Sequence, residues 1–290
     1  MTPPAAREPA LMRDFSLEIT SRDVDAIPAA ARLIPAGTRI NVTFLSNEEP
    51  ATTVAAARAV RDAGFVPVPH LAARRIRSLE AFTSILKQLQ AASVSEHLFL
   101  IAGDPAQPEG LFADAASLIR AVRLADYGVR EVGIAGYPEG HPSIPTDVLW
   151  ASLDEKLGEL RVQGLESVIV TQFGFDVDAV ARWIGEVRLR GYDGPIRVGA
   201  PGPAGVKRLL RYASRFGVAS SAGIVRKYGF SLANLMGTAG PDTFIRALQD
   251  AVARDGGFGA VAMHLYTFGG LEATAAWARD FVAAPGGSTS

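Results

Sequence analysis

The stretch EVGIAGYPEGHPS, residues 131–143, joins an apolar run to a cluster of turn-forming and ionisable residues. Residues 132–135 (VGIA) are typical of a strand buried on both faces, as in a parallel sheet. A tyrosine, a glutamate and a histidine follow it within six residues. Polar groups at the carboxyl end of a buried strand are typical of a site carried by the sheet.

The same pattern recurs along the chain, because seven further apolar runs have the length of a strand. These runs cover residues 15–20, 39–44, 66–70, 98–102, 167–171, 196–200 and 260–266. Segments with apolar residues at three-to-four spacing lie between them, as expected for helices. These segments are residues 50–64, 78–92, 114–128, 176–191 and 241–256. Gly64 is the expected C-cap of the first and Ser78 the N-cap of the second.

Eight strands alternating with helices predict a single-domain (β/α)8 TIM barrel of the α/β class. We place the barrel at residues 14–284, between flexible tails at 1–13 and 285–290. The long gap between the last two strands is expected to hold a helix at 206–216, an extra segment within 218–239 and a further helix. The alternative is an open doubly wound sheet, which needs fewer strands and usually a glycine-rich turn after the first; here SRDVD follows.

Composition narrows the class of protein. The chain has 290 residues, 48% of them hydrophobic, a net charge of -1 and no cysteine. Nucleic-acid and membrane-surface binding are not indicated, and thiolate chemistry and disulfides are excluded. No apolar run approaches the roughly 18 residues of a membrane span, and no signal peptide is seen. We expect a cytoplasmic monomer or small homo-oligomer.

Polar residues gather at the predicted carboxyl ends of the strands, where a barrel forms its active site. They are Glu18, Asn41, Thr43, His70, Asp104, Tyr137, Glu139, His141, Gln172, His264 and Tyr266. Three of the four histidines are in this set. The fourth, His97, begins a strand and is expected to be solvated on the opposite face.

Glu18 stands inside the apolar run FSLEIT, where an unpaired buried carboxylate is costly. Such a group often has a raised pKa, which suits a general acid. Simpler interpretations stay open for two others: His264 as a hydrogen-bonded structural residue and Glu139 as the cap of a turn. Three histidines with Asp104 and Glu18 also leave a metallohydrolase open. We predict no metal site, because no histidine pair has the helical spacing of a zinc site.

Taken in order, these motifs resemble the methylenetetrahydrofolate reductase family from about residue 15 to 277. The motifs are FSLEIT, NVTF, PVPHLAAR, AGD, AGYPEGHP, VTQFGFD and LYTF. YPEGHP and TQFGFD carry most of the resemblance. It implies a (β/α)8 barrel that interconverts 5,10-methylenetetrahydrofolate and 5-methyltetrahydrofolate in one-carbon and methionine metabolism. Electrons come from NAD(P)H, usually through FAD.

The resemblance also implies roles by position. Glu18 and Asp104 match catalytic acids, and Asp104 also lies near the pterin. Gln172, Phe173 and Tyr266 match folate-binding positions. The cofactor positions are Thr43, His70, Gly103, Tyr137, Glu139 and His141.

The chain departs from the family pattern on the flavin side. Ala102 replaces an arginine, residues 44–46 (FLS) replace Tyr-Gly-Ala, and the family's phosphate-binding lysine has no clear match. PGPAGV also stands where a phenylalanine is expected. We therefore predict weak or no FAD binding and direct reduction by NAD(P)H, with Arg74 or Arg75 as partners of its phosphates. The alternative use of these two arginines, as substitutes for the missing cations at the flavin phosphates, stays open. The alternatives are a non-catalytic folate-binding barrel and another flavin- or deazaflavin-dependent reductase. NADH or NADPH, and the direction of reaction, stay open.

Overall fold

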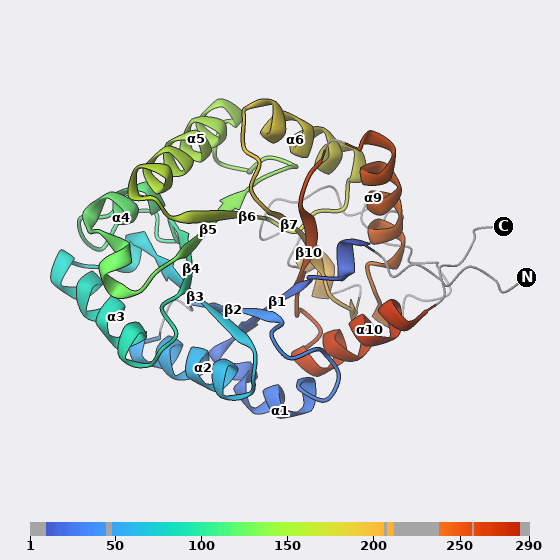
Figure 1. Ribbon diagram of the computed structural model, residues 1–290, viewed down its shortest axis with the longest axis horizontal. Coiled ribbons are helices and arrows are strands. Elements are labelled where there is room, and N and C mark those ends of the chain that lie inside the picture. Colours follow the sequence, from blue (N-terminus) through green and yellow to red (C-terminus); the bar gives the residue numbers. More distant parts are fainter. Residues whose placement is uncertain (1–9, 45–47, 206–207, 212–237, 257, 285–290) are drawn as a thin grey trace, which may run out of the picture.

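The computed structural model describes residues 10–44, 48–205, 208–211, 238–256 and 258–284, and its main feature is a closed barrel of eight parallel strands. The order around the barrel is β1-β10-β7-β6-β5-β4-β3-β2 (Figure 1). The strands are β1 Ser16–Thr20, β2 Arg39–Thr43, β3 Val66–Ala72, β4 His97–Ile101, β5 Glu131–Gly136, β6 Glu166–Thr171, β7 Ile196–Pro201 and β10 Val261–Tyr266. The predicted single-domain (β/α)8 barrel is confirmed.

Helices surround the strands as an outer ring (Figure 1). They are α1 Ile27–Ala30, α2 Pro50–Asp62, α3 Leu79–Ala91, α4 Ala115–Ala121, α5 Thr146–Gln163, α6 Val177–Leu189, α9 Asp242–Asp255 and α10 Leu271–Ala283. Two predicted caps are confirmed. Gly64 has the left-handed φ of 85° just after α2, and the Ser78 hydroxyl accepts a hydrogen bond from Ala81 N. No helix among the described residues is long and apolar enough to cross a membrane.

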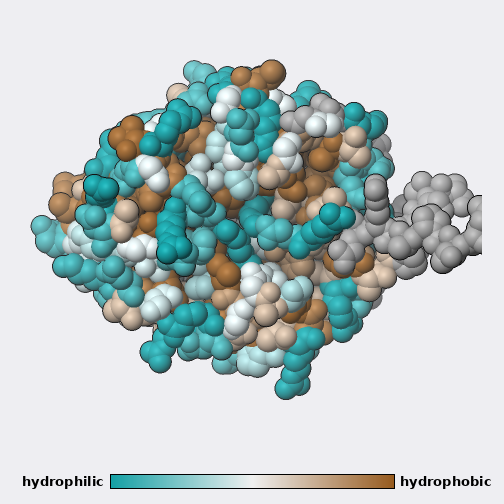
Figure 2. Space-filling view, in the orientation of Figure 1, coloured by the Kyte–Doolittle hydropathy of each residue, from teal (hydrophilic) through white to brown (hydrophobic). Residues whose placement is uncertain are grey.

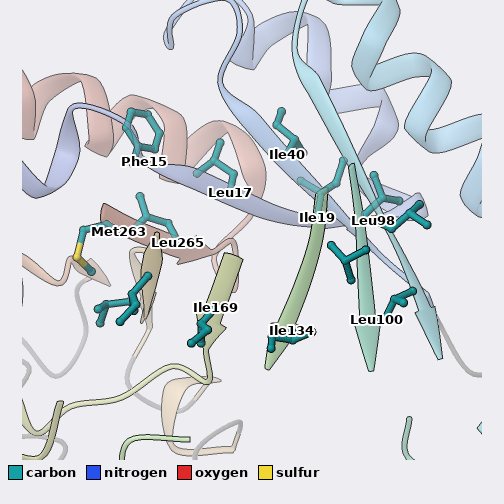
Figure 3. Packing of buried hydrophobic residues seen from close by; sticks show 14 of the residues in the cluster. Phe15, Leu17, Ile19, Ile40, Leu98, Leu100, Ile134, Ile169, Met263 and Leu265 are labelled. Atoms are coloured by element: carbon teal, nitrogen blue, oxygen red, sulfur yellow. The ribbon is translucent and has the colours of Figure 1, made fainter. Parts of the chain in front are cut away.

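The main hydrophobic core lies between the barrel and the helices. Alternate residues of each strand point outward, and these are the apolar ones. Leu17, Ile40, Leu98 and Leu265 are at most 1% exposed, and Figure 3 shows them in this layer. Shortening one of these leucines to alanine should cost about 2–5 kcal/mol. On the face shown in Figure 2, hydrophilic and hydrophobic residues are intermingled.

Two short strands, β8 Ala204–Gly205 and β9 Thr238–Ala239, pair antiparallel beside the barrel and were not predicted. The helix expected at 206–216 is helical at residues 208–211, and residues 206–207 and 212–216 lie outside the described residues. Most of the extra segment within 218–239 also lies outside them.

A short ordered turn precedes residue 14, the predicted start of the domain. Residues Ala10–Met12 form a 3-10 turn, η1, and Leu11 and Met12 are each 2% exposed. This turn packs against β10 and α9, because its two large apolar side chains find cover there. Residues 10–12 thus pack on the barrel; residues 1–9 and 285–290 lie outside the described part of the chain.

Charged residues fill the amino-terminal end of the barrel. Arg39 of β2 pairs with Glu131 of β5, two strands that are not neighbours, so the pair spans the lumen. His97 Nδ1 lies 3.3 Å from Glu131 Oε1, and Arg197 pairs with Asp14. The expectation that His97 is solvated is wrong, because its ring contacts the buried Glu131 carboxylate.

Candidate functional site

The carboxylate of Glu18 lies between two imidazoles inside the barrel. Its Oε2 atom is 3.5 Å from His264 Nε2 and 3.8 Å from His70 Nε2. The Glu18 side chain is 19% exposed, whereas the His70 and His264 side chains are 3% and 0% exposed. The three residues come from β1, β3 and β10, and β1 and β3 are not neighbours. The predicted convergence of these strand positions is therefore present, and it is built across the lumen.

Each imidazole is held by a second polar group. Ser16 Oγ lies 2.8 Å from His264 Nδ1, and Asn41 Nδ2 lies 3.1 Å from His70 Nε2. Ser16 was not among the predicted site residues, and Asn41 was noted only for its position. The signal that marks Ser16 is its place two residues before Glu18, since a period of two puts both side chains in the lumen.

The surroundings of Glu18 set its ionisation. Burial alone would raise its pKa, but the hydrogen bond from His264 and the nearby His70 and His264 imidazoles outweigh burial and lower the pKa below its usual value. Burial lowers the pKa of His70 to about 4, although Glu18 opposes this shift. The raised pKa expected for Glu18 is thus wrong for the free protein, because the sequence did not show that two histidines would flank it.

An aromatic cluster forms another part of the wall. The Phe173 ring is 5.5 Å from the Tyr266 ring and 5.1 Å from the Phe268 ring, centroid to centroid. The Tyr266 hydroxyl donates a hydrogen bond to Thr171 O at 3.0 Å, and burial raises its pKa well above the usual value. Tyr266 therefore offers a ring face, since its hydroxyl is already used. Phe173 is 2% exposed and packs edge to face against this ring.

Gln172 follows β6 beside this cluster. Its Oε1 accepts a hydrogen bond from Phe173 N at 3.1 Å, and its own N donates to Gly136 O at 2.8 Å. The side-chain nitrogen has no partner among the described residues. The residue is therefore fixed in place with an amide donor to spare, as a ligand-binding position requires.

Asp104 lies on the loop after β4 and does not contact Glu18 in the described part of the chain. Its carboxylate, 63% exposed, accepts hydrogen bonds from Arg75, whose Nε is 3.1 Å from Oδ1. Arg75 also lies 3.7 Å from Glu109. Gly103 precedes Asp104 with a φ of 92°, a left-handed conformation that favours glycine. The two predicted catalytic acids thus occupy different surroundings.

The Arg74 side chain donates hydrogen bonds to backbone carbonyl groups of the same loop. Its Nε donates to Ala113 O at 2.8 Å and its Nη1 donates to Pro105 O at 3.1 Å. Its backbone N donates to Ala102 O at 2.9 Å. The guanidinium groups of Arg74 and Arg75 are both engaged by this loop, so a role toward cofactor phosphates stays a prediction.

The loop after β5 contains three predicted cofactor positions with different contacts. The rings of Tyr137 and His141 meet edge to face, with centroids 5.5 Å apart. Burial raises the pKa of Tyr137 and lowers that of His141. The Glu139 carboxylate instead accepts backbone hydrogen bonds from Phe175 and Asp176 at 2.5 and 2.8 Å. These bonds fit the simpler interpretation of Glu139, the cap of a turn, and its role as a cofactor position stays a prediction.

Three further observations describe the surroundings of the site. Thr43 Oγ1, at the end of β2, is buried, and its hydroxyl faces Glu18 and helps to lower the pKa of that carboxylate. A cavity of about 560 Å³ lies between α5, α6 and the loop after β5, outside the strands; Tyr137 and Glu139 line it and Glu18 does not. Within the described residues no group of three or more ionisable side chains is arranged to hold a metal ion.

Comparison with known proteins places this geometry in a family. Residues 23–275 match the sequence profile of methylenetetrahydrofolate reductase. The chain is 32% identical over 109 residues to methylenetetrahydrofolate reductase 2 of Saccharomyces cerevisiae, a match covering 35% of this chain and 18% of that protein. It is 31% identical over 127 residues to methylenetetrahydrofolate reductase 1 of Schizosaccharomyces pombe, covering 41% of this chain and 20% of that protein.

The matched region thus spans about a fifth of the length of these curated relatives. A solved structure of an uncharacterized protein from Clostridium thermocellum, which binds two copies of 5-methyl-5,6,7,8-tetrahydrofolic acid, has the same fold. Its TM-score is 0.60 at 12% identity, over 93% of this chain and 95% of that one. Since the profile covers most of the barrel, this chain belongs to the methylenetetrahydrofolate reductase family.

Proposed function

We propose that this chain interconverts 5,10-methylenetetrahydrofolate and 5-methyltetrahydrofolate, with NAD(P)H as the electron donor. The observation that carries the proposal is the Glu18 carboxylate held between His70 and His264 inside a barrel of this family. A protein that only binds folate has no need of an ionisable group in this setting, whereas a reaction that transfers a proton does.

Glu18 is the proposed general acid. It gives its proton to the nitrogen that leaves the methylene bridge, hydride from the nicotinamide adds to the bridge carbon, and solvent returns a proton to the carboxylate. The pKa of Glu18 is lowered in the free protein, so the acid has to form when a ligand binds. A folate that covers the exposed 19% of the side chain removes water from it, and desolvation favours the neutral acid.

Asp104, Gln172, Phe173 and Tyr266 are the proposed folate pocket. A carboxylate and an amide suit the donor and acceptor edge of the pterin, and an aromatic face suits its planar ring. The spare amide nitrogen of Gln172 and the exposed carboxylate of Asp104 supply the polar contacts. The Tyr266 ring, fixed through its hydroxyl, supplies the apolar one.

The flavin side of the site fits FAD poorly. A tightly held pyrophosphate needs cations or a helix N-terminus around it. Ala102 stands where the family has an arginine, and its carbonyl accepts a hydrogen bond from Arg74. The Arg74 and Arg75 side chains already bind the loop after β4. We therefore infer that the chain binds FAD weakly or not at all.

A nicotinamide cofactor needs fewer fixed cations around its phosphates than FAD, because it binds and dissociates in each turnover. The proposed contacts are the predicted cofactor positions Thr43, His70, Gly103, Tyr137 and His141. Arg75 is the proposed phosphate partner, because the Asp104 carboxylate that it contacts is 63% exposed and stands where a ligand can reach it. Hydride then passes directly to the folate, and the kinetics are those of a ternary complex.

Purification without added flavin tests the proposal. A colourless protein that oxidises NAD(P)H with methylenetetrahydrofolate, and whose rate does not rise with FAD, is the expected result. A yellow protein whose activity is lost on flavin removal and restored by FAD would overturn the flavin-free route. Binding of 5-methyltetrahydrofolate without turnover, with or without FAD, would instead favour a non-catalytic folate-binding barrel.

A further inference from the structure

Beneath Glu18 lies a histidine that the proposed chemistry does not yet use. His264 has no exposed surface, and its ring nitrogens face two residues of one strand. Nδ1 is 2.8 Å from Ser16 Oγ, and Nε2 is 3.5 Å from Glu18 Oε2. Ser16 is the register partner of His264 in the β1–β10 pairing, so the backbone fixes this arrangement.

The burial of Ser16 decides which ring nitrogen carries a proton. The Ser16 side chain has no exposed surface, and His264 Nδ1 is its hydrogen-bond partner in the described chain. A buried hydroxyl that donates no hydrogen bond destabilises the fold by about 1–3 kcal/mol. The hydroxyl therefore donates to Nδ1, and the neutral ring carries its hydrogen on Nε2, directed at Glu18.

We propose that Ser16 and His264 form a positioning pair that controls the proton of Glu18. The Nε2 hydrogen stabilises the ionised carboxylate, so the free protein holds Glu18 without its proton and takes one up from solvent when a ligand shields the carboxylate. His264 does not contact the reacting atoms in this scheme. The consequence for catalysis rests on the proposed function; the control of the Glu18 proton does not.

The neighbouring ionisable groups are few. From β3, His70 faces both Glu18 and His264, and from β10 the Tyr266 ring lies 5.0 Å from the His264 ring. Tyr137 acts on Tyr266 from the loop after β5. The hydroxyl of Thr43 faces Glu18 from β2. These groups are present in every variant below, so a change at position 264 or 16 is measured against a constant background.

Two substitutions of His264 separate its two contacts. Asparagine places an amide near the Nδ1 position and keeps a partner for Ser16, but it does not reach Glu18. Glutamine places its amide nitrogen near the Nε2 position and keeps a neutral donor toward Glu18. Ser16→Ala removes the group that orients the ring. His97→Gln is the matched control, because it removes a histidine that faces Glu131 at the other end of the same barrel.

The readout is a ¹³C titration of glutamate carboxyl carbons in the ligand-free protein, in which the Glu18 signal is the one missing from Glu18→Gln. We expect the Glu18 midpoint to rise by about one pH unit in His264→Asn, which is about tenfold in proton affinity. We expect a smaller rise of the Glu18 midpoint in Ser16→Ala, and a midpoint near that of the parent protein in His264→Gln. The control should leave Glu18 unchanged.

An unchanged Glu18 midpoint in His264→Asn, or an equal rise in His97→Gln, would overturn the proposal. Should His264→Asn not fold, Ser16→Ala carries the same test, and an unchanged midpoint there would overturn it. The titration needs no substrate, so a chain without reductase activity would remove the proposed function and leave this result standing. In an active chain, the falling limb of kcat/KM should move to higher pH in His264→Asn.

Discussion

Glu139 reaches across to the loop after β6 at a point where that loop has no side chain. A β-carbon on Gly174 would lie 2.6 Å from Glu139 Oε1, the oxygen that accepts hydrogen bonds from Phe175 N and Asp176 N. The carboxylate cannot move aside without losing those bonds. Gly174 is therefore needed so that the loops after β5 and β6 can be tied together next to the proposed site.

Gly174→Ala and Glu139→Gln should both loosen this tie. We expect each to lower the free energy of unfolding by about 1–3 kcal/mol, since part-buried hydrogen bonds to a carboxylate are weakened. Chemical denaturation measures this, with Glu155→Gln, an exposed pair partner on α5, as the control. Weaker NAD(P)H binding in Glu139→Gln with no loss of stability would instead assign Glu139 to the cofactor.

Glu18→Gln should nearly abolish methylenetetrahydrofolate reduction while the protein stays folded and still binds folate. A lost general acid typically lowers the rate by about 10²–10⁴. Steady-state assays and folate titration measure the two effects separately. Activity within about threefold of the parent would remove Glu18 from the mechanism.

Asp104→Asn and Gln172→Ala should weaken folate binding more than NAD(P)H binding. Each lost contact to a charged or buried partner should cost about 1–3 kcal/mol. Isothermal titration with each ligand measures the difference, and Asp62→Asn, an exposed aspartate paired with Arg61, is the control. Equal losses for both ligands would count against the pocket.

Glu131 should make the barrel sensitive to acid. Burial opposes its charge, yet His97 and Arg39 lower its pKa from 4.5 to about 2. A lowered carboxyl pKa stabilises the fold above pH 4.5 and loses that contribution as the pH falls toward 2. Glu131→Gln should therefore lower the free energy of unfolding by about 3 kcal/mol at neutral pH. The remaining stability should vary less over the acidic range, and an undiminished acid dependence would contradict this role.

Lys156 of α5 should destabilise the fold in its charged form. Its residue is 8% exposed, and burial lowers the pKa from 10.5 to about 8 against the pull of Asp114 and Glu155. The unfolded chain binds more protons between these values, so stability should rise with pH from 8 to 10.5. Lys156→Met should raise the free energy of unfolding at neutral pH by about 1–3 kcal/mol and flatten that rise. Thermal unfolding over this range measures both, and a destabilised variant would show that the ammonium group is well paired.

The strands were predictable because both faces of each are largely covered, which leaves long apolar runs such as LFLIA. Helix α5 was harder to see, since Lys156 stands on its buried face and interrupts the apolar stripe. The turn at residues 10–12 was missed because a short apolar segment carries no periodicity. Long-range pairs also leave no local signal. The contacts of His264 with Ser16, and of His97 with Glu131, join residues far apart in sequence, so neither the lowered pKa of Glu18 nor the pairing of His97 could be read in advance.

The Arg39–Glu131 ion pair crosses the lumen between β2 and β5 and closes the amino-terminal end of the barrel, with η1 packed nearby. Ligands are then expected to enter the barrel from its carboxyl end. If folate and NAD(P)H stack on each other in the barrel, they cannot exchange places, so the ligand that binds deeper must bind first and dissociate last. The closed amino-terminal end thus predicts an ordered binding mechanism, and product-inhibition patterns would identify the ligand that binds deeper.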